Sequence, residues 1–454
     1  NDIHTVYFVG IGGIGMSALA RYFNGRGAAV HGYDKTETPL TKTLVDEGMT
    51  IHYEEDLARI PEEVDLVVYT PAVPAAHREL QYFRANGYPV RKRAEVLGLI
   101  SRHRKTVAVA GTHGKTTTSS MLAYLLRVGG VDCTAFLGGI ARDFDSNFVE
   151  GKGEWVVVEA DEYDRSFLQL SPDIAVILST EPDHLDIYGD AERILETGFR
   201  AFAARVKTGG ELLVNAAVRE QLEGGHALRT YGLERGDCRA ERIRVEDGRF
   251  VFDYRSPEVD LEGLQLAMPG RHNVENATAA LTVALRIGVA PEAIRRGLAD
   301  FRGIKRRFER IWVGADTVFI DDYAHHPSEL RAAIGAAREL YPGRRLTGIF
   351  QPHLYSRTRD FADGFAAALD ELDEVFLLDI YPAREAPIPG VDAATILDQM
   401  TNPRRALLRK DELLERIRNG RWDVLLTLGA GDIDRLVAPI AEALKATENA
   451  NKTP

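Results

Sequence analysis

The chain has 454 residues, of which 45% are hydrophobic and 27% charged, which is typical of globular proteins. At roughly 150 residues per domain, this length predicts about three domains. A net charge of −12 argues against a dedicated nucleic-acid-binding protein. No apolar run approaches the ~18 residues that a membrane-spanning helix needs, and the N-terminal residues lack a signal-peptide pattern. Two cysteines are too few for a disulfide framework, so we expect a reduced, cytoplasmic location.

Strand and helix signals alternate from the start of the chain, which favours an α/β fold with a parallel sheet. A basic stretch at 102–105 ends this pattern, and we place the first domain at 1–104. The expected elements are strands at 6–9, 28–31 and 66–69 and a helix at 17–23.

Two further α/β domains are predicted, at 105–303 and 304–454, joined by a basic linker at 301–310. Between 211 and 266, short strands alternate with polar turns, which favours an antiparallel insertion. The first and third domains are predicted to be Rossmann-like, and the central one resembles a phosphate-loop ATPase domain. Expected strands are 106–110, 155–159, 174–178, 317–320, 345–350, 374–378 and 424–428, and expected helices are 115–128 and 273–288.

A glycine loop follows the first predicted strand. Gly10-Ile11-Gly12-Gly13-Ile14-Gly15 fits the G-x-G-x-x-G pattern between a strand and a helix. Glycines there let backbone N–H groups approach a pyrophosphate at a helix N-terminus. Asp34, at the end of the second predicted strand, is placed to hold a ribose hydroxyl. The loop predicts a nucleotide with a diphosphate, either NAD or a UDP-sugar.

A second glycine loop, Gly111-Thr112-His113-Gly114-Lys115-Thr116-Thr117, again joins a strand to a helix. It is a shortened phosphate loop, because Val109 stands where the first glycine is usual and Gly111 replaces it. Loop N–H groups would cradle phosphates, Lys115 would reach the outer phosphates, and the Thr116 hydroxyl is placed for Mg²⁺. A nucleotide-linked substrate that is activated by ATP needs both loops, whereas an oxidoreductase or a simple ATPase needs only one.

Acids and histidines follow the strands of the central domain. The cluster Glu159-Ala160-Asp161-Glu162-Tyr163-Asp164 comes after one strand, and Asp183-His184 follows the next. Carboxylates at the carboxyl end of a strand face the ligand crevice of an α/β sheet, and one or two of them suffice for Mg²⁺. Asn273 and Asn276 are three residues apart, so on a helix they share a face and can meet one ligand.

The third domain repeats this placement. Asp321 to Pro327 and Gln351 to Arg359 each follow a strand. The adjacent histidines His325 and His326 do not share a helix face, so a polar cluster facing a ligand is favoured over a zinc site. Arg357 suits a carboxylate or a phosphate, because the guanidinium group binds both with two parallel hydrogen bonds.

Taken in order, these motifs resemble those of the Mur ligases, the ATP-dependent amide-forming enzymes of peptidoglycan synthesis. The resemblance covers nearly the whole chain and is strongest to the member that adds L-alanine to UDP-N-acetylmuramate. It implies a first domain that binds the UDP-sugar, a central domain that binds ATP with Mg²⁺ or Mn²⁺, and a third domain that binds the amino acid. The implied partners are these small molecules, without nucleic acid or membrane insertion, in a monomer or homodimer.

The resemblance also implies roles for residues at matching positions. Lys115, His325, Arg307 and Asp322 would be catalytic. The metal ligands would be Thr116, Glu159 and His184. The UDP-sugar would contact Gly10, Gly12, Gly13, Ile14, Gly15, Asp34, Thr70 and Pro71. ATP would contact Gly111 to Thr117, His272, Asn273, Asn276, Arg307 and Asp322. The amino acid would contact Tyr323, His325, His353 and Arg357.

The chain departs from the family pattern at three places. Leu354 stands where Arg is frequent, within the segment assigned to the amino-acid carboxylate. Ser179 stands where Asn is frequent before the Asp-His pair. No lysine occurs from His184 to Val206, so we do not predict the carbamylated lysine that several Mur ligases use.

The implied reaction activates the muramyl carboxylate as an acyl phosphate, which the alanine amine then attacks, with His325 as the candidate base. Within the family, the alternative is the recycling ligase that attaches a preformed tripeptide. A nicotinamide-dependent oxidoreductase would explain the first glycine loop and Asp34 but leave the second loop unused. A non-catalytic ATP-regulated binding protein would explain both loops but not the acids and histidines after the strands.

Overall fold

The computed structural model describes residues 3–181, 191–222, 227–383 and 385–452. Within these ranges the strands form three sheets, of five, ten and six strands, which confirms the α/β class. By compactness the chain divides into two units, because the N-terminal region groups with most of the central one. The first unit is Asn1–Arg242, Phe252–Gln265 and Glu275–Arg302, and the second is Ile243–Val251, Leu266–Val274 and Gly303–Pro454. None of the helices in the described part of the chain has the length and apolar character needed to cross a membrane.

The N-terminal sheet has the order β3-β2-β1-β4-β5, with all four pairings parallel. The predicted strands and helix of this region are confirmed. The strands are β1 (Thr5–Val9), β2 (Ala29–Tyr33), β3 (Thr50–His52), β4 (Leu66–Tyr69) and β5 (Val90–Lys92). The helices are α1 (Ile14–Asn24), α2 (Pro39–Asp46), the short η1 (Leu57–Arg59), α3 (Arg78–Ala85) and α4 (Arg93–His103).

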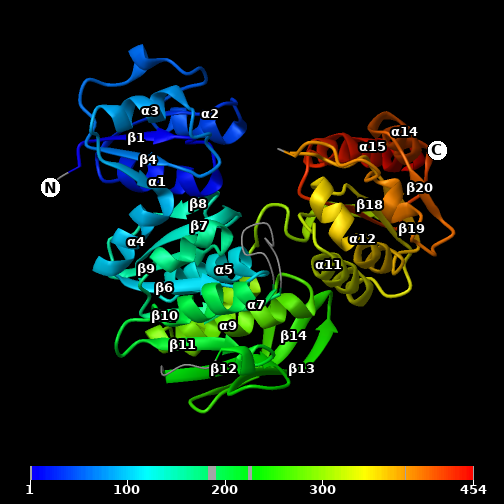
Figure 1. Ribbon diagram of the computed structural model, residues 1–454. Helices are drawn as coiled ribbons and strands as arrows, with labels where there is room; N and C mark the ends of the chain where they lie inside the picture. Colours follow the sequence, from blue (N-terminus) through cyan, green and yellow to red (C-terminus); the bar gives the residue numbers. More distant parts are fainter. Residues whose placement is uncertain (1–2, 182–190, 223–226, 384, 453–454) are drawn as a thin grey trace. The chain divides into compact units, whose positions relative to one another are not determined.

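Alternate residues of β1 face two different cores, as the period of a strand requires. Val6 and Phe8 pack in a cluster with residues of α1, whereas Tyr7 and Val9 pack in a cluster with Phe83 of α3. Figure 1 shows α1 and α3 on opposite sides of this sheet. Both faces of β1 are therefore buried, which fits its almost wholly apolar sequence.

A buried carboxylate lies in this second cluster. The side chain of Glu79 is fully buried and accepts hydrogen bonds from Tyr7 Oη (2.7 Å) and from the backbone N–H of Asp56 (3.0 Å). Its other contact is His52 Nε2, at 2.8 Å. Burial acts to raise the pKa of Glu79, but the hydrogen bonds from His52 and Tyr7 lower it. The group therefore tethers β1, β3 and α3 through one ionised side chain.

The central sheet has the order β15-β14-β13-β12-β11-β10-β6-β9-β7-β8. Its strands are β6 (Lys105–Ala110), β7 (Cys133–Ala141), β8 (Ser146–Val149), β9 (Trp155–Ala160), β10 (Ile174–Ile177), β11 (Glu211–Asn215), β12 (Ala227–Leu233), β13 (Cys238–Glu246), β14 (Arg249–Arg255) and β15 (Asp260–Leu266). The helical segments are α5 (Lys115–Val128), η2 (Tyr163–Gln169), α7 (Ala191–Ile194), η3 (Leu195–Arg200), α8 (Ala201–Ala203), η4 (Arg219–Gln221), α9 (Arg271–Ile287) and α10 (Pro291–Asp300).

The expectation of an antiparallel insertion from 211 to 266 is wrong for its first half. The pairs β10–β11, β11–β12 and β12–β13 are all parallel, so this segment extends the parallel sheet. The segment between β11 and β12, residues 216–226, is long enough for the crossover that a parallel pair requires. The prediction failed because a pattern of short strands and polar turns looks the same in the sequence for a crossover and for a hairpin loop.

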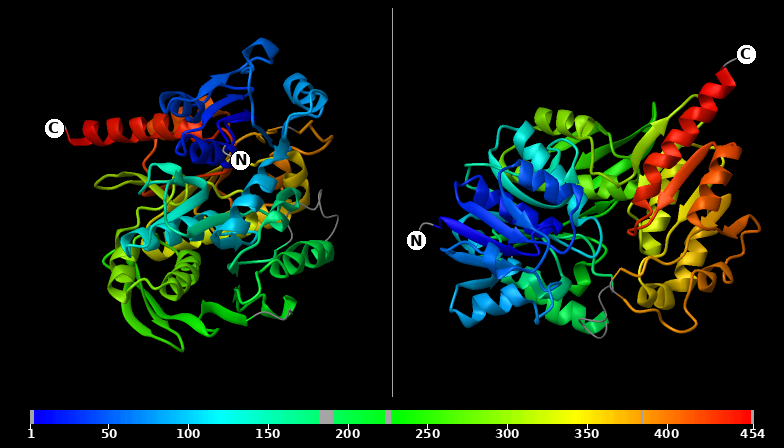
Figure 2. Two further views of the ribbon diagram at one scale, coloured as in Figure 1. Left: turned by 90° about the vertical axis from the view of Figure 1, so that its left-hand side faces the viewer. Right: turned by 90° about the horizontal axis from the view of Figure 1, so that it is seen from above.

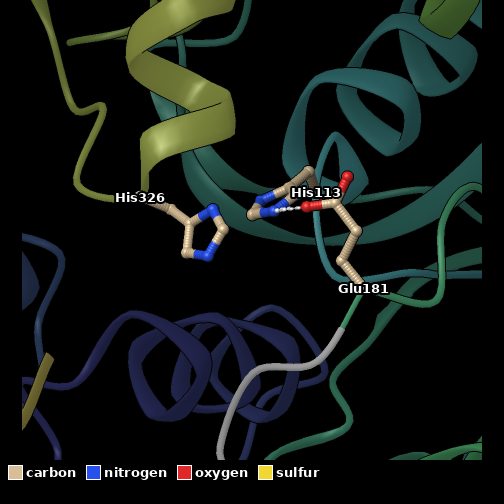
Figure 3. A group of neighbouring side chains, drawn as sticks. All are labelled: His113, Glu181 and His326. Carbon is tan, nitrogen blue, oxygen red and sulfur yellow. Dashed lines mark hydrogen bonds and ion pairs between the residues drawn. The ribbon is translucent and has the colours of Figure 1, made fainter. Parts of the chain in front are cut away.

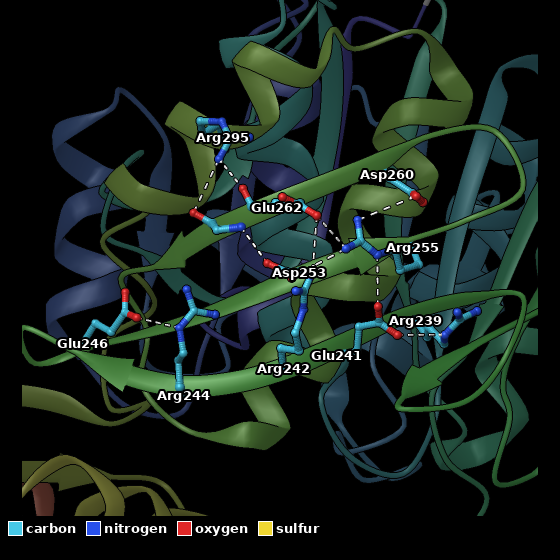
Figure 4. Close-up of polar contacts among 11 residues, drawn as sticks. Arg239, Glu241, Arg242, Arg244, Glu246, Asp253, Arg255, Asp260, Glu262 and Arg295 are labelled. Carbon is cyan, nitrogen blue, oxygen red and sulfur yellow. Dashed lines mark hydrogen bonds and ion pairs between the residues drawn. The ribbon is translucent and has the colours of Figure 1, made fainter.

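The last strands of this sheet carry a network of ion pairs (Figure 4). Arg255 contacts Glu241 at 3.0 Å, Glu262 at 2.8 Å and Asp260 at 3.7 Å. Arg242 pairs with Asp253 and Glu262. Individually, exposed pairs contribute little stability, but charges along β15 protect the edge of a sheet from pairing with another chain.

The C-terminal sheet has the order β16-β17-β21-β18-β19-β20, in which only the edge pair β16–β17 is antiparallel. Its strands are β16 (Glu309–Val313), β17 (Val318–Asp322), β18 (Leu346–Phe350), β19 (Glu374–Leu377), β20 (Arg405–Leu407) and β21 (Val424–Leu428). Strand β16 begins inside the predicted linker. The helices are α11 (Pro327–Leu340), α12 (Tyr355–Leu369), α13 (Ala394–Leu397), α14 (Lys410–Asn419) and α15 (Asp434–Lys452).

Helices cover both faces of the C-terminal sheet. Ile320 of β17 packs in one cluster with residues of α11 and α12, while Phe319 packs in another with residues of α14 and α15. Helix α15 is the long red helix in both views of Figure 2. Polar residues lie at the carboxyl ends of the parallel strands, because Asp322 ends β17 and Gln351 directly follows β18.

We expect Glu79→Gln to lower the free energy of unfolding by about 2–4 kcal/mol, because an amide cannot replace a buried, ionised acceptor of three donors. Urea unfolding of both proteins would measure this loss. Glu37→Gln is a matched control, because it removes an exposed pair with Lys42 and should cost less than about 0.5 kcal/mol. Equal effects of the two substitutions would contradict the prediction.

Candidate active site

The first glycine loop connects β1 to α1. Gly10 has φ +86°, a conformation that favours glycine. The backbone N–H of Gly12 donates to Asp34 Oδ2 at 2.7 Å, so the predicted ribose-binding carboxylate lies against the loop. In this structure Asp34 acts as an acceptor for the loop backbone, and its contact with a ribose stays a prediction.

A cavity of about 310 Å³ opens beside this loop. Predicted residues line it from three segments, namely Gly13 to Gly15, Thr70 with Pro71, and Glu159. Gly10, Gly12 and Asp34 are not among its lining residues. Arg93 also lines it and lies so close to Gly15 that a Cβ there would be 2.6 Å from Arg93 Nη1. Arg93 was not predicted, and it brings to this cavity a guanidinium group, which binds phosphates with two parallel hydrogen bonds.

The second glycine loop ends in a left-handed residue, Gly114, with φ +83°. A Cβ at Gly114 would overlap Asn276 Oδ1, so the predicted Asn276 packs directly against the loop. Gly111 has φ +139°, which is also unfavourable for other residues. Both glycines are therefore required by local geometry.

The segment after β10 is hydrogen-bonded to this loop. The Thr112 hydroxyl donates to the Glu181 carbonyl at 2.7 Å, and the His113 N–H donates to Ser179 Oγ at 3.1 Å. Figure 3 shows the His113 ring directed at the Glu181 carboxylate, with Nε2 and Oε2 3.1 Å apart. Ser179, which departs from the family pattern, thus contributes a loop contact.

Lys115, the first residue of α5, is turned back into the loop. Its Nζ donates to the Gly111 carbonyl at 2.7 Å and to Glu162 Oε2 at 2.8 Å. Burial acts to lower the pKa of Lys115, but the carboxylates of Glu162, Asp161 and Glu159 raise it. Lys115 is therefore a buried ammonium group, held by a carboxylate to which sequence reasoning gave no individual role.

Two of the predicted metal ligands lie at neighbouring strand ends. Thr116 is the second residue of α5, the helix that comes after β6. Glu159 lies near the end of β9, which pairs with β6. Glu159 Oε2 accepts the Gly138 N–H at 2.9 Å. The third ligand, His184, lies with Asp183 outside the described residues. A hydroxyl and a carboxylate are oxygen donors of the type that Mg²⁺ prefers.

A second cavity, of about 450 Å³, lies next to the phosphate loop. Its lining includes Leu178 to Glu181, Asn215 and Glu275. Burial raises the pKa of Glu275, which favours its neutral form. No role was predicted for Glu275, although it lies between Asn273 and Asn276, and Asn215 belongs to no motif in the sequence.

In the second unit, Asp322 ends β17 as a buried carboxyl group. Its two oxygens accept the N–H groups of Phe308 (2.7 Å) and Ala324 (2.8 Å). Burial raises its pKa to about 6, against the effect of Arg307. Asp322 therefore fixes the segment that carries Arg307, whose guanidinium lies 5.3 Å from the centre of the Tyr323 ring.

His325 is fixed in one tautomer by its neighbours. Its Nδ1 lies 3.0 Å from the Tyr323 carbonyl and 3.1 Å from Glu329 Oε2. Both partners accept hydrogen bonds, so we assign the proton to Nδ1 and the lone pair to Nε2. Burial lowers the pKa of His325 to about 4, although Glu329 acts to raise it. The ring is therefore neutral at pH 7 and can accept a proton.

The predicted amino-acid residues gather around His325. The His353 ring lies 6.3 Å from the His325 ring and is stacked on Tyr381 at 5.8 Å, and Tyr323 lies 5.1 Å away. The charge of Arg357 contributes to the lowered pKa of His325. Leu354, next to His353, has φ +70°, a strained conformation for this residue.

Two predicted ATP-binding residues lie at the start of α9. This helix begins at Arg271, so Asn273 is inside its first turn, where Nδ2 donates to the Pro269 carbonyl at 2.7 Å. Burial, followed by the charge of Arg307, lowers the pKa of His272 to about 4. Both residues belong to the second unit, whereas Asn276 belongs to the first.

Family models match three consecutive segments of the chain. They are described as the Mur ligase family catalytic domain (residues 5–105), the Mur ligase middle domain (109–284) and the Mur ligase glutamate ligase domain (306–431).

Relatives match over nearly the full length. The UDP-N-acetylmuramate–L-alanine ligase of Parabacteroides distasonis is 51% identical, with 98% of each chain covered. That of Flavobacterium johnsoniae is 48% identical, again with 98% of each chain covered. The crystal structure of UDP-N-acetylmuramate-alanine ligase from Thermotoga maritima is similar with a TM-score of 0.82 and 28% identity, over 98% of this chain and 100% of that one. A murein peptide ligase from Psychrobacter arcticus has a TM-score of 0.69 and 25% identity, over 96% and 99%.

The lowered pKa of His325 predicts a dependence of stability on pH. Between pH 6.5 and about 4 the unfolded chain protonates this histidine and the folded chain does not, so the free energy of unfolding falls as the pH falls. The raised pKa of Asp322 acts in the opposite direction below about pH 6, so a comparison with His325→Gln isolates the histidine. From about pH 7 to about pH 4.5, we expect the unsubstituted protein to lose about 2 kcal/mol more than the variant in urea unfolding. Parallel losses in the two proteins would show that His325 is not the group responsible.

Proposed function

The chain belongs to the Mur ligase family, and from this premise we propose that it joins L-alanine to the carboxylate of UDP-N-acetylmuramate while converting ATP to ADP and phosphate. The observation that carries the assignment is the 46–51% identity to eight UDP-N-acetylmuramate–L-alanine ligases, each over at least 96% of this chain. This reaction uses both glycine loops, whereas neither an oxidoreductase nor a simple ATPase does.

Each predicted domain takes one substrate in this proposal. Residues 1–104 bind the UDP-sugar, 105–303 bind ATP, and 304–454 bind L-alanine. The matched segments 5–105, 109–284 and 306–431 support these borders. The cavity beside the first glycine loop suits the sugar nucleotide, because it joins loop glycines to the cation of Arg93 and reaches Glu159.

The reaction needs two bond exchanges. A muramyl carboxylate oxygen attacks the γ-phosphorus of ATP, so that a new O–P bond forms and the bond to ADP breaks. The alanine amine then attacks the acyl carbon, the C–N bond forms, and phosphate leaves with the C–O bond electrons. A free carboxylate resists attack by an amine, so activation precedes amide formation, and the protein contributes mainly positioning and charge compensation.

Lys115 contributes the charge compensation at the phosphates. Thr116 and Glu159, together with His184, would hold Mg²⁺ beside them. When bound, the ion supplies positive charge that offsets the negative charge of the triphosphate.

His325 is the base in this proposal. The alanine amine must lose a proton when the C–N bond forms, and Nε2 of a neutral His325 has the lone pair that accepts it. Glu329 acts through His325, because its Oε2 accepts both the ring Nδ1–H and the backbone N–H of that residue, at 3.1 Å and 3.0 Å. Arg357 and His353 would hold the carboxylate of the amino acid.

An assay of phosphate release tests the whole proposal. With ATP, Mg²⁺ and UDP-N-acetylmuramate present, we expect L-alanine to stimulate release and Lys115→Ala to abolish it, because the variant lacks the ammonium group at the phosphates. Lys105→Ala is the matched control, since it removes an exposed lysine that pairs with Glu154 and should leave turnover near normal.

Two outcomes of that assay would redirect the assignment. Stimulation by a preformed tripeptide but not by alanine would favour the recycling ligase, and the structural similarity to a murein peptide ligase would then support the assignment. Near-normal turnover of Lys115→Ala would refute the role of the second glycine loop.

We expect Glu329→Gln to lower kcat at saturating L-alanine by about tenfold or more, because the amide no longer fixes the proton on Nδ1 of His325. Steady-state assays at pH 7 and pH 9 would measure it. The control Glu339→Gln changes a half-buried partner of Arg271 on the same helix and should retain activity. Loss of activity in both variants alike would indicate damage to α11 rather than to the base.

A further inference from the structure

All three N–H donors of the Lys115 ammonium group are engaged in hydrogen bonds in this structure. A lysine ammonium carries three N–H donors. They meet the Gly111 carbonyl at 2.7 Å, the Thr112 carbonyl at 3.4 Å and the Glu162 carboxylate at 2.8 and 3.1 Å. A phosphate that binds Lys115 must therefore replace one of these partners.

We propose that Glu162 is a positioning residue that holds the Lys115 ammonium in the phosphate loop until nucleotide binds, and that the nucleotide phosphate then takes its place. This inference rests on the proposed function, in which the second glycine loop binds ATP.

The carboxylate, rather than the carbonyls, is the partner that can give way. Gly111 and Thr112 belong to the loop itself, and the Thr112 hydroxyl is fastened to the Glu181 carbonyl. Glu162 comes from a different segment, just after β9 and before η2 (Tyr163–Gln169). Its side chain can therefore withdraw without any change in the loop that cradles the phosphates.

Electrostatics also favours the exchange of the Glu162 carboxylate for a phosphate. The Glu162 side chain is 1% exposed and that of Lys115 13%, so each charge would be costly to leave alone in the interior. The carboxylate stabilises the ammonium in the absence of ligand. An incoming phosphate supplies the same negative charge, so two anions then compete for one cation, and nucleotide affinity is reduced by the strength of the contact that it displaces.

This role differs measurably from that of a purely structural ion pair. If Glu162 only supports the fold, Glu162→Gln weakens or does not change nucleotide binding. If it competes with phosphate for Lys115, the same substitution strengthens binding, and the gain requires the lysine. In a Lys115→Met background the ammonium group for which the two anions compete is absent, so replacement of Glu162 should have little effect.

Isothermal titration with MgADP provides the test. We expect Glu162→Gln to lower the Kd about three- to tenfold, the equivalent of one displaced hydrogen-bonded contact. In the Lys115→Met background, the same substitution should change the Kd less than about twofold. Glu154→Gln is the matched control, because it removes the carboxylate of an exposed lysine pair, and its Kd should equal that of the unsubstituted protein.

An unchanged or higher Kd for a folded Glu162→Gln protein would overturn the proposal, as would an equal gain in the Lys115→Met background. Thermal melting establishes whether each variant is folded. If Glu162→Gln does not fold, Glu162→Asp replaces it. That variant withdraws the carboxylate by one methylene and should lower the Kd about twofold, and an unchanged Kd would again overturn the proposal. Failure of the unsubstituted protein to bind MgADP would instead refute the proposed function, and this inference with it.

Discussion

The candidate site is built around charges that are kept away from water. A buried charge is stable only when an opposite charge or several hydrogen bonds accompany it. Lys115 meets this requirement through Glu162, and Arg306 pairs with Asp321 at 3.0 Å. Asp322 relies instead on two backbone N–H groups. Both nucleotide substrates of the proposed reaction are anionic, so a phosphate that binds Lys115 must exchange contacts with the carboxylate that stabilises this lysine without ligand.

The parallel sheets explain why these groups collect at a few places. Glu159 lies at the carboxyl end of β9, and the phosphate loop follows the adjacent strand β6. In the second unit, Asp322 ends β17, which pairs with β21. Because parallel strands end at the same edge, residues far apart in the sequence meet there without special loops. The acidic net charge of the chain therefore says little about its affinity for anions, which depends on local cations such as Lys115 and Arg93.

Local signals made much of this predictable from the sequence. Helix α5 and strands β4 and β21 have the predicted bounds, because glycine loops and buried apolar runs are encoded in adjacent residues. The parallel pairing of β11, β12 and β13 was missed, since it depends on contacts between segments that a local pattern does not contain. For the same reason, no individual role was predicted for Glu162, Glu329 or Arg93. Each acts on a partner that another element supplies, namely Lys115 on α5, a histidine on the preceding loop, and the first glycine loop.

Burial shifts two titratable groups of the second unit in opposite directions. It lowers the pKa of His325 to about 4 and raises that of Asp322 to about 6. The same buried environment thus keeps the imidazole neutral and makes the carboxyl group easier to protonate. Neighbouring groups whose pKa values are shifted in opposite directions are suited to different roles. A neutral imidazole suits the acceptance of a proton from an amine, whereas Asp322, with both oxygens engaged by backbone N–H groups, suits the fixing of the segment that carries Arg307. The chemistry proposed for this unit therefore follows from desolvation, and it requires that His325 stay shielded from water while the amine reacts.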